Sequence, residues 1–395
     1  MLIPNQIVHL KSNTVELLTT FLDEKPLDFF AVVQDEAQIN DIYYSIVRNK
    51  VETENAFFVE YQKDKLGYLK TKGEKLSLGS KILAMVKKTG AGKIPEMTTD
   101  ISFVGNFIIY KPLENKGLSL SRKLNAQNKE TLQKNFLDQI MPQESLIIRS
   151  SAANTSIENI KLELINFRNK SQELLAHNLK PLTKMPSSSN QLELFVTENI
   201  ENLEKITTND VSSYNHIKNF CFHTFPEFNI ELEFIGNKNR IFDLYEIKEA
   251  IETVFSHKVK LQPKGFISII QTPALTAIDI DSESAKNNDD FLELWVKEAA
   301  YQIQLRNLSG KIIIDPPFLP SLKTLKRIAD LIKTHLENDS VNSYVAGVSP
   351  LGNIEISRER IRPTTLEILG GSDSIYGNNY SNLPLKPMFE TFFNE

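Results

Sequence analysis

The stretch LTAIDIDSES, residues 275–284, places acidic residues among strongly β-forming ones, and KIIIDPP, residues 311–317, repeats the arrangement. Branched and apolar residues without a helical period predict a strand in each stretch. Because side chains alternate along a strand, Asp279 and Asp281 are expected to point to the same face. The first stretch therefore predicts two carboxylates on one face of a sheet in the C-terminal half of the chain.

Two interpretations of these acids remain open at the level of pattern. Carboxylates that lie close together repel each other unless water or a shared cation lies between them. If the two strands are neighbours, Asp279 and Asp315, at the end of the second strand, would converge on one hard cation such as Mg²⁺. The alternative is that Asp281 is a solvent-facing strand residue and that Asp315, before two prolines, is a turn residue.

Length and composition limit the class of protein. With 395 residues the chain exceeds one typical core, so two to four domains are expected. The 45 basic and 50 acidic residues give a net charge of −5, so nucleic-acid binding would depend on local patches. No apolar run is long enough for a membrane span and the N-terminus lacks a signal-peptide pattern, which predicts a cytoplasmic protein. Cys221 is the only cysteine, which excludes an intrachain disulfide and a multi-cysteine zinc site.

From about residue 29 the sequence changes to short strand-like segments separated by turns, which predicts a small barrel of the OB type. Phe58 and Tyr68, on adjacent predicted strands, are candidates for stacking on bases. The alternative places one or both rings in the barrel core. The lysines expected near the phosphates are Lys87, Lys88 and Lys93.

Other segments carry less specific patterns. Residues 14–24 look helix-like, and residues 231–255 look like a hairpin that runs into a helix. Helices at 291–305 and 324–336, together with the strands at the acidic stretches, predict an α/β layer. The last twenty-five residues, rich in Gly, Ser, Asn and Pro, predict a loosely packed tail.

Six segments resemble, in order, motifs of the ribonuclease E/G endoribonucleases. The segments are TTDISFVGNFIIYKP (98–112), LIIRSSA (146–152), IFDLYEIKEAIE (241–252), QTPALTAIDID (271–281), QLRNLSGKIIID (304–315) and SPLGNIEISRERIRP (349–363). The resemblance runs from about Asp41 to Pro363. Six motifs in the same order are far more specific than one.

The resemblance implies an α+β multidomain fold in which an OB-fold β-barrel is inserted into an RNase H-like subdomain. A 5′-sensor subdomain and a DNase I-like α/β catalytic domain complete it. The implied boundaries are 1–35 for the N-terminal part of the RNase H-like subdomain, 36–100 for the OB-fold RNA-binding domain, 101–185 for the 5′-sensor domain, 190–255 for the second part of the RNase H-like subdomain, 256–365 for the catalytic domain and 366–395 for a C-terminal tail.

The resemblance also implies a function: Mg²⁺-dependent hydrolysis of single-stranded RNA to 5′-phosphate and 3′-hydroxyl ends, with 5′-monophosphate sensing, in RNA processing or decay. Asp279 and Asp315 fall on the catalytic, metal-binding aspartates, and Asp281 falls on a position that supports the first of them. The positions of the 5′-phosphate pocket are Gly105, Ile109, Arg149 and Ser150. The RNA-contacting positions of the barrel are Phe58, Tyr68, Lys87 and Lys93.

The chain departs from the family pattern in two ways. The Cys-Pro-x-Cys zinc link expected after Arg362 is absent, so no zinc is expected and any oligomer would not be zinc-linked. Next to the predicted metal site, residues 282–290 read SESAKNNDD, and residues 315–319 read DPPFL, in place of the family's Gly-Arg-Phe-Thr and Asp-Phe-Ile-Asp-Met stretches. A catalytically weakened RNA-binding protein of the same fold is therefore the alternative function.

Overall fold

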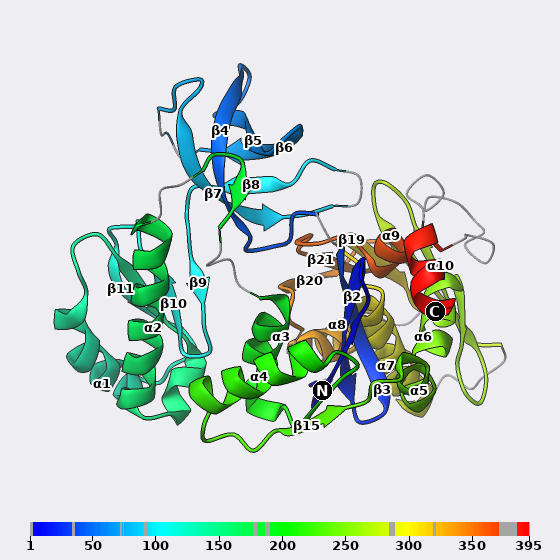
Figure 1. The fold of residues 1–395 in the computed structure, drawn as a ribbon. Coiled ribbons are helices and arrows are strands. Elements are labelled where there is room, and N and C mark those ends of the chain that lie inside the picture. Colours follow the sequence, from blue (N-terminus) through cyan, green and yellow to red (C-terminus); the bar gives the residue numbers. More distant parts are fainter. Residues whose placement is uncertain are drawn as a thin grey trace. The chain divides into compact units, whose positions relative to one another are not determined.

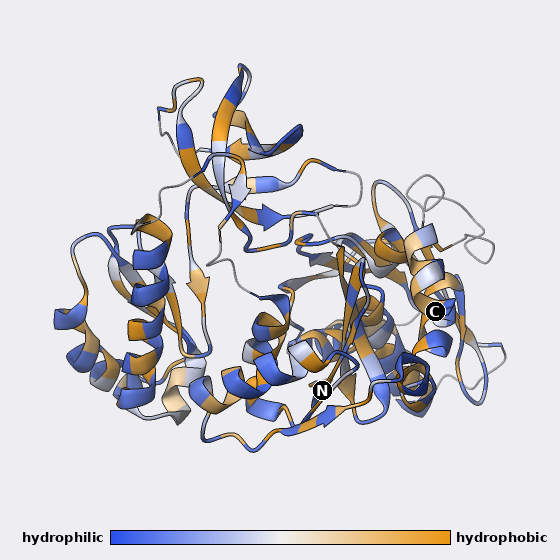
Figure 2. Ribbon diagram, in the orientation of Figure 1, coloured by the Kyte–Doolittle hydropathy of each residue, from blue (hydrophilic) through white to orange (hydrophobic). Residues whose placement is uncertain are grey.

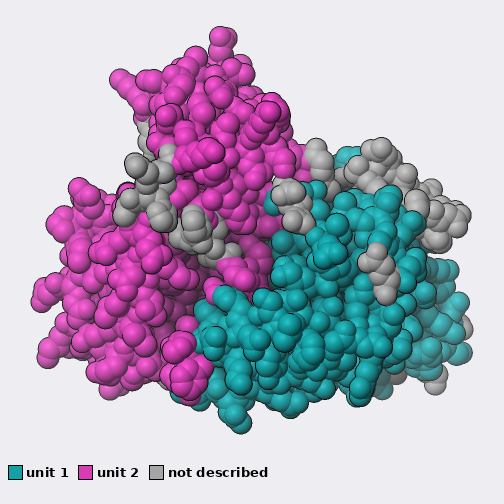
Figure 3. Space-filling view, viewed as in Figure 1, with its two compact units in different colours: residues 1–36, 201–221, 227–395 teal, residues 37–200, 222–226 magenta. Residues whose placement is uncertain are grey.

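The chain forms two compact units, which Figure 3 shows in different colours. Unit 1 comprises residues 1–36, 201–221 and 227–395, and unit 2 comprises residues 37–200 and 222–226. In sequence, unit 2 is thus an insertion into unit 1. The structure, a computed structural model, describes residues 3–33, 36–71, 73, 75–90, 93–176, 180–185, 190–283, 289–318, 321–337, 339–370 and 385–394.

Unit 2 contains a closed five-stranded barrel, consistent with an OB fold (Figure 1). Its strands are β4 (Ile42–Val51), β5 (Ala56–Gln62), β6 (Lys65–Lys70), β7 (Lys81–Lys88) and β8 (Glu96–Thr98). The order is β4-β5-β6-β8-β7, and β7 pairs back with β4, which closes the barrel. Alternation along β5 puts Phe57, Val59 and Tyr61 inside the barrel. The sequence therefore predicted this barrel correctly.

The rest of unit 2 is a four-stranded sheet with helices. The sheet has the order β11-β12-β10-β9. Its strands are β9 (Phe103–Val104), β10 (Ile108–Lys111), β11 (Gly117–Leu120) and β12 (Ser145–Ile148). The helices are α1 (Ala126–Phe136), α2 (Ile157–Ala176) and α3 (Gln191–Asn199), and the short strand β13 (Thr183–Lys184) adds to β4 of the barrel. Phe136, Leu146, Ile148 and Ile160 are buried between the sheet and the helices.

Unit 1 begins with a five-stranded sheet of order β15-β14-β1-β2-β3. Its strands are β1 (Gln6–Lys11), β2 (Val15–Leu22), β3 (Lys25–Val33), β14 (Lys205–Thr208) and β15 (Glu231–Phe234). The helix-like interpretation of residues 14–24 was wrong, because most of this segment is β2. The pairing of β2 with β1 on one side and β3 on the other stabilises a strand that the local sequence does not specify.

The hairpin predicted at residues 231–255 was also wrong. β15 pairs in parallel with β14, and two helices follow it, α5 (Lys238–Leu244) and α6 (Ile247–Phe255). The remaining helices around this sheet are α4 (Val211–Thr224), α9 (Thr365–Leu369) and α10 (Pro387–Asn394). Because a parallel partner comes from a distant segment of the chain, local pattern could not distinguish this strand from one arm of a hairpin.

The loosely packed C-terminal tail is corrected where the structure describes it. Phe389, Phe392 and Phe393 of α10 are buried in the core that also contains Leu366 and Leu369 of α9. The three phenylalanines recur at helical spacing and form one apolar stripe. Residues 371–384 of the predicted tail lie outside the described residues.

The second sheet of unit 1 has the order β16-β17-β18-β19-β21-β20. Its strands are β16 (Lys258–Lys260), β17 (Phe266–Gln271), β18 (Thr276–Asp281), β19 (Gly310–Asp315), β20 (Ser343–Val348) and β21 (Ile354–Arg358). The helices α7 (Asp289–Leu305) and α8 (Leu322–Leu336) share one core with its buried isoleucines. The predicted α/β layer is confirmed, and its opposite face carries both polar and apolar side chains, among them the exposed Asp279 and Asp315.

The helices carry hydrophobic and hydrophilic residues interspersed along their length, as Figure 2 shows. Such a mixture is typical of helices that bury one side and expose the other. Within the described ranges, none of the helices combines the length and the apolar character that crossing a membrane requires.

Candidate functional site

The two acidic strands lie side by side. β18 and β19 are parallel neighbours, and Asp279 pairs in register with Asp315. Both side chains are exposed, whereas Ile278 and Ile314, the residues that precede them, are buried against the helices. The condition set by the sequence, that the two strands are neighbours, is therefore met, and the two carboxylates lie on the face of the sheet that points away from the helices.

The electrostatics of the pair are those of crowded anions. The pKa of Asp279 is raised from its ordinary value, first by partial burial and then by the negative charges of Asp315 and Asp281. Asp281 is exposed, and its carboxylate accepts a hydrogen bond of 2.9 Å from the backbone amide of Glu283. Negative charge is therefore concentrated near the C-terminal ends of β18 and β19. A bound cation would reduce the repulsion between these carboxylates.

The donor set matches a small hard cation that keeps most of its own water. Mg²⁺ in proteins is commonly held by one or two carboxylates and completes its octahedron with water or phosphate oxygens. The described residues contain no group of three or more His, Cys, Asp or Glu side chains placed to hold a metal ion. Asp279 and Asp315 could supply the two carboxylates of such a partly hydrated site, and the described residues contain no larger set of possible ligands.

Further polar groups line the same face. Ser268 of β17 lies opposite Asp279. Glu355 of β21 lies opposite Ile313, two residues before Asp315, so Glu355 and Asp315 are diagonal neighbours on one face. On the edge strand β16, the ammonium group of Lys258 lies 3.2 Å from the ring centroid of Phe266. The face therefore offers hydroxyl, acidic and basic groups around the carboxylate pair.

A buried arginine fixes the beginning of β19, the strand that ends at Asp315. The guanidinium of Arg358 donates to both carboxylate oxygens of Asp339, at 2.6 and 3.0 Å, and to the side-chain oxygen of Asn307 at 2.7 Å. It also donates to the carbonyl of Leu308 at 2.9 Å. Arg358 and Asp339 are only 2% and 3% exposed. No sequence pattern indicated this anchoring role, although Asn307 and Arg358 lie inside the segments 304–315 and 349–363.

The residues predicted for a 5′-phosphate pocket gather in the small sheet of unit 2. β10, which contains Ile109, pairs with β12, and Arg149 follows β12 directly. The Arg149 guanidinium donates to the carbonyl of Gly105, and its backbone amide donates to the carbonyl of Phe107 at 2.8 Å. Ser150 is exposed at the start of a short 3-10 helix, Ser150–Asn154.

The backbone amides beside Gly105 already have acceptors. The Gly105 amide donates to the carbonyl of Ile108 at 2.8 Å. The next three amides, of Asn106, Phe107 and Ile108, all donate to the carboxylate of Glu163 on α2. Sequence reasoning did not identify Glu163, since an acidic residue inside an amphipathic helix looks like any other. Its burial in the fold is what distinguishes it.

The two aromatic candidates of the barrel lie outside its core. Phe58 of β5 and Tyr68 of β6 are cross-strand partners, with ring centroids 5.7 Å apart in an edge-on arrangement. Both are half-buried, whereas the neighbouring Phe57 and Leu69 are buried in the barrel. The Tyr68 hydroxyl donates to Glu54. The interpretation that either ring forms part of the barrel core is therefore wrong.

The lysines of the barrel are less uniform. Lys87 is 53% exposed and its ammonium lies 3.1 Å from a carboxylate oxygen of Glu96 on β8. Lys93 is exposed and follows the undescribed residues 91–92. Lys70, which was not predicted, has its ammonium 5.9 Å from the centre of the Tyr68 ring. A basic group thus accompanies the aromatic pair.

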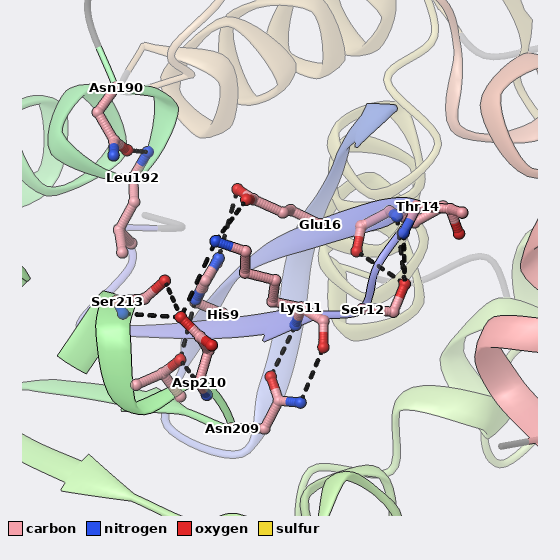
Figure 4. A network of polar contacts seen from close by, with 12 residues as sticks. His9, Lys11, Ser12, Thr14, Glu16, Asn190, Leu192, Asn209, Asp210 and Ser213 are labelled. Carbon is pink, nitrogen blue, oxygen red and sulfur yellow. Dashed lines mark hydrogen bonds and ion pairs between the residues drawn. The ribbon is translucent and has the colours of Figure 1, made fainter. Parts of the chain in front are cut away.

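A second polar cluster, drawn in Figure 4, joins β1, β2 and the end of β14. His9 is 1% exposed, and its Nδ1 lies 2.9 Å from the hydroxyl of Thr208. Its Nε2 lies 3.6 Å from Glu16, and the pKa of Glu16 is lowered chiefly by this histidine. The Asn209 side chain bonds both backbone groups of Lys11, at 2.7 and 3.0 Å. These contacts link three strands of the sheet, β1, β2 and β14, and thus have a structural role.

Comparison with known proteins finds a family model and several relatives that match this chain. Residues 102–361 match the model of the ribonuclease E/G family. Ribonuclease G of Salmonella typhimurium (strain SL1344) is 26% identical over 306 residues, which are 74% of this chain and 62% of the relative. Ribonuclease E of Buchnera aphidicola subsp. Acyrthosiphon pisum (strain APS) is 24% identical over 358 residues, 82% of this chain and 40% of the relative.

A third relative, a ribonuclease E/G-like protein of Pyropia yezoensis, is 26% identical over 374 residues, 86% of this chain and 72% of the relative. The chain thus spans less than two thirds of the length of the two bacterial relatives. The family match covers both the small sheet of unit 2 and the second sheet of unit 1. On this basis the chain belongs to the ribonuclease E/G family.

Proposed function

We propose that this protein is an Mg²⁺-dependent endoribonuclease that hydrolyses single-stranded RNA and leaves 5′-phosphate and 3′-hydroxyl ends. The observation that carries the proposal is the register of Asp279 and Asp315 on the exposed face of their sheet. The names of the relatives, ribonuclease G and ribonuclease E, support the reaction class. RNA processing or decay in the cytoplasm is the setting that follows from this assignment.

Asp279 and Asp315 would hold the metal ion through one carboxylate each. The ion, when bound, supplies a Lewis acid that lowers the pKa of a coordinated water and offsets charge on the scissile phosphate. Asp281 adds a third negative charge beside Asp279, which strengthens the attraction for a cation. The buried Arg358–Asp339 pair holds the strand that presents Asp315.

The remaining parts of the fold take roles that suit their side chains. The barrel face of Phe58 and Tyr68, with Lys87 and Lys93 beside it, would bind single-stranded RNA by stacking and by charge. We further propose that the first sheet of unit 1, with parallel β14 and β15 beside an antiparallel meander, is RNase H-like. The second sheet with α7 and α8 would be the DNase I-like catalytic layer.

The small sheet of unit 2 would sense the 5′ end of the RNA. Arg149 offers a guanidinium whose planar fork matches phosphate, and Ser150 offers an exposed hydroxyl next to it. Gly105 and Ile109 complete the proposed pocket from the neighbouring strand. Because the nearby amides already have acceptors, the side chains of Arg149 and Ser150 carry most of the proposed phosphate binding.

A second candidate function is RNA binding without efficient hydrolysis. It is favoured by the acidic residues that follow Asp281 in place of basic ones, such as Glu283 and Asp289, and by the prolines directly after Asp315. Residues 284–288 of that segment lie outside the described residues. An acidic segment beside the metal site would repel the RNA backbone. No zinc is expected for either function, and an oligomer, if formed, would not be zinc-linked.

One experiment separates the two candidates. Purified full-length protein is incubated with a 5′-monophosphorylated single-stranded oligoribonucleotide, in Mg²⁺ or in EDTA, and products are resolved by length. Cleavage in Mg²⁺ that stops in EDTA, with 3′-hydroxyl products that poly(A) polymerase extends, supports the enzyme. Retention of intact RNA in both buffers, with a measurable dissociation constant, supports the binding protein.

A further inference from the structure

Glu163, on helix α2, places a carboxylate in the turn between β9 and β10. The residue is only 7% exposed. One carboxylate oxygen accepts the amide of Asn106 at 2.7 Å, and the other accepts the amides of Phe107 and Ile108, both at 2.9 Å. Three consecutive amides directed at one group form an anion-binding nest, and here a side chain of the same chain occupies it.

The opposite side of this turn is held by donors. The Arg149 guanidinium donates to the carbonyl of Gly105, and the Ser151 hydroxyl donates to the carbonyl of Asn106. A β-carbon at Gly105 would lie 2.4 Å from the carboxyl carbon of Glu163, so the close approach of the carboxylate requires glycine there. The turn is therefore held by the carboxyl group of Glu163 and by the guanidinium of Arg149.

Arg149 is the charged group that acts on the titration of Glu163. Burial raises the pKa of Glu163 to about 7, and the three amides and the positive charge of Arg149 oppose that rise. The other titratable groups of this core, Tyr110, Glu144 and Arg168, hydrogen-bond to one another. Both charge states of Glu163 are consequently populated near neutral pH.

We propose that Glu163 is a specificity-determining residue of the 5′-end pocket, which positions the turn that faces Arg149 and takes up a proton when a 5′-phosphate binds. This inference rests on the 5′-end recognition proposed above. A phosphate on Arg149 offsets the positive charge that favours ionised Glu163, so its binding shifts Glu163 toward the neutral form. Because linkage is reciprocal, protonation of Glu163 in turn favours phosphate binding.

The same turn contains a buried hydrogen-bond donor that is available to an acceptor atom of the ligand. The side-chain nitrogen of Asn106, a residue 3% exposed, has no hydrogen-bond partner within the described residues. Buried donors are normally satisfied, and a phosphate oxygen at the turn is a suitable acceptor. The turn thus combines a fixed backbone, a neighbouring guanidinium and an unsatisfied donor.

The test measures binding, so it does not depend on catalysis. Dissociation constants of the full chain in EDTA are measured for one oligoribonucleotide with a 5′-monophosphate or a 5′-hydroxyl, between pH 6 and pH 8. The proteins are the unmutated chain, Glu163→Gln, and Glu158→Gln as a matched control, since Glu158 is an exposed carboxylate on the same helix. Ionisation of the 5′-phosphate itself affects binding to all three proteins in the same way, and the control variant shows this effect alongside the others.

In the unmutated chain and in Glu158→Gln, the preference for the 5′-monophosphate should strengthen toward pH 6. In Glu163→Gln the preference should strengthen less over the same pH range. A pKa shift of one unit would change that preference by about tenfold. Isothermal titration of the unmutated chain, in two buffers of different ionisation enthalpy near pH 7, should also show uptake of a fraction of a proton per phosphorylated ligand. This second measurement stands even if Glu163→Gln fails to fold.

Two failures are distinguishable. A preference for the 5′-monophosphate without proton uptake, and with the same pH profile in Glu163→Gln, would overturn the role of Glu163 and leave the pocket intact. Absence of any preference at every pH would overturn the 5′-end pocket itself, and the role of Glu163 with it. Neither result bears on hydrolysis at Asp279 and Asp315.

Discussion

Asp279 of β18 lies directly opposite Asp315 of β19, and both carboxylates point to the open face of a sheet whose other face is covered by helices. In the sequence, helix α7 lies between the two strands that carry this pair. Partial burial, and then the negative charges of Asp315 and Asp281, raise the pKa of Asp279 above its ordinary value. Water or a shared cation between the two carboxylates would reduce this repulsion.

Asp279→Asn and Asp315→Asn should each reduce RNA cleavage by about 100-fold or more, because asparagine keeps the shape and removes the charge that holds the metal ion. Initial rates on a phosphorylated single-stranded oligonucleotide are the measurement. Asp330→Asn, an exposed aspartate on α8, is the matched control and should cleave like the unmutated protein. Normal turnover by either of the first two variants would remove them from the active site.

Mg²⁺ should stabilise the protein most where Asp279 is ionised. The pKa of folded Asp279 lies above its usual 3.8, so without metal its contribution to stability is present at low pH and is lost as pH rises through the folded value. Added Mg²⁺ should therefore raise Tm more at neutral pH than at the acid end of the range, since the ion binds the deprotonated carboxylates. Thermal melts in Mg²⁺ and in EDTA measure the effect. Asp315→Asn should abolish the Mg²⁺-dependent increase, and a full increase in that variant would place the ion elsewhere.

Phe58→Ala and Tyr68→Ala should each weaken binding of single-stranded RNA by about 1–3 kcal/mol, because each removes one stacking surface from the outside of the barrel. Their melting temperatures should stay close to that of the unmutated protein. Phe57→Ala is the control on the same strand: it empties a core position, at a cost of about 3–5 kcal/mol of stability. Binding titrations beside thermal melts distinguish the two kinds of position. Since Phe58 and Tyr68 contact each other, the double substitution should cost less than the sum.

Arg149→Gln should erase the faster cleavage expected for 5′-monophosphorylated RNA over the same RNA with a 5′-hydroxyl, since the guanidinium supplies the charged fork for the phosphate. The ratio of kcat/KM for the two substrates is the measurement. Lys116→Gln, at an exposed lysine in the same unit, should leave the ratio unchanged. Equal rates on both substrates with the unmutated protein would mean that the pocket does not sense the 5′ end.

Arg358→Ala should destabilise the protein by about 3–5 kcal/mol, because it leaves the Asp339 carboxylate buried without its partner. Arg327→Ala is the contrasting control. It removes the ion pair between Arg327 and Asp289, which has the same 2.6 Å length. Because these side chains are 47% and 73% exposed, the loss of stability should be less than about 1 kcal/mol. Urea unfolding of the three proteins gives the comparison, and similar losses for both variants would contradict the assigned anchoring role.

The sequence by itself determined the elements whose pattern is local. Short strand-like segments separated by turns predicted the barrel strands, and helical spacing predicted α7 and α8. The branched residues before Asp279 and Asp315 predicted two strands that the structure contains. The six motifs in the same order also indicated the ribonuclease E/G family. Such motifs can be recognised in the sequence because they consist of particular residues at fixed positions along the chain, such as Gly105 and Arg149.

Only the tertiary structure decided what depends on partners distant in sequence. Most of residues 14–24 form strand β2 because β1 and β3 pair with it. β15 is a parallel strand and not part of a hairpin because β14 lies beside it. The same reason applies to the site: strand register put Asp279 beside Asp315, and packing of α2 against the small sheet buried Glu163 among three amides. Hydrogen-bond partners and burial are properties of the folded neighbourhood, and no local sequence pattern contains them.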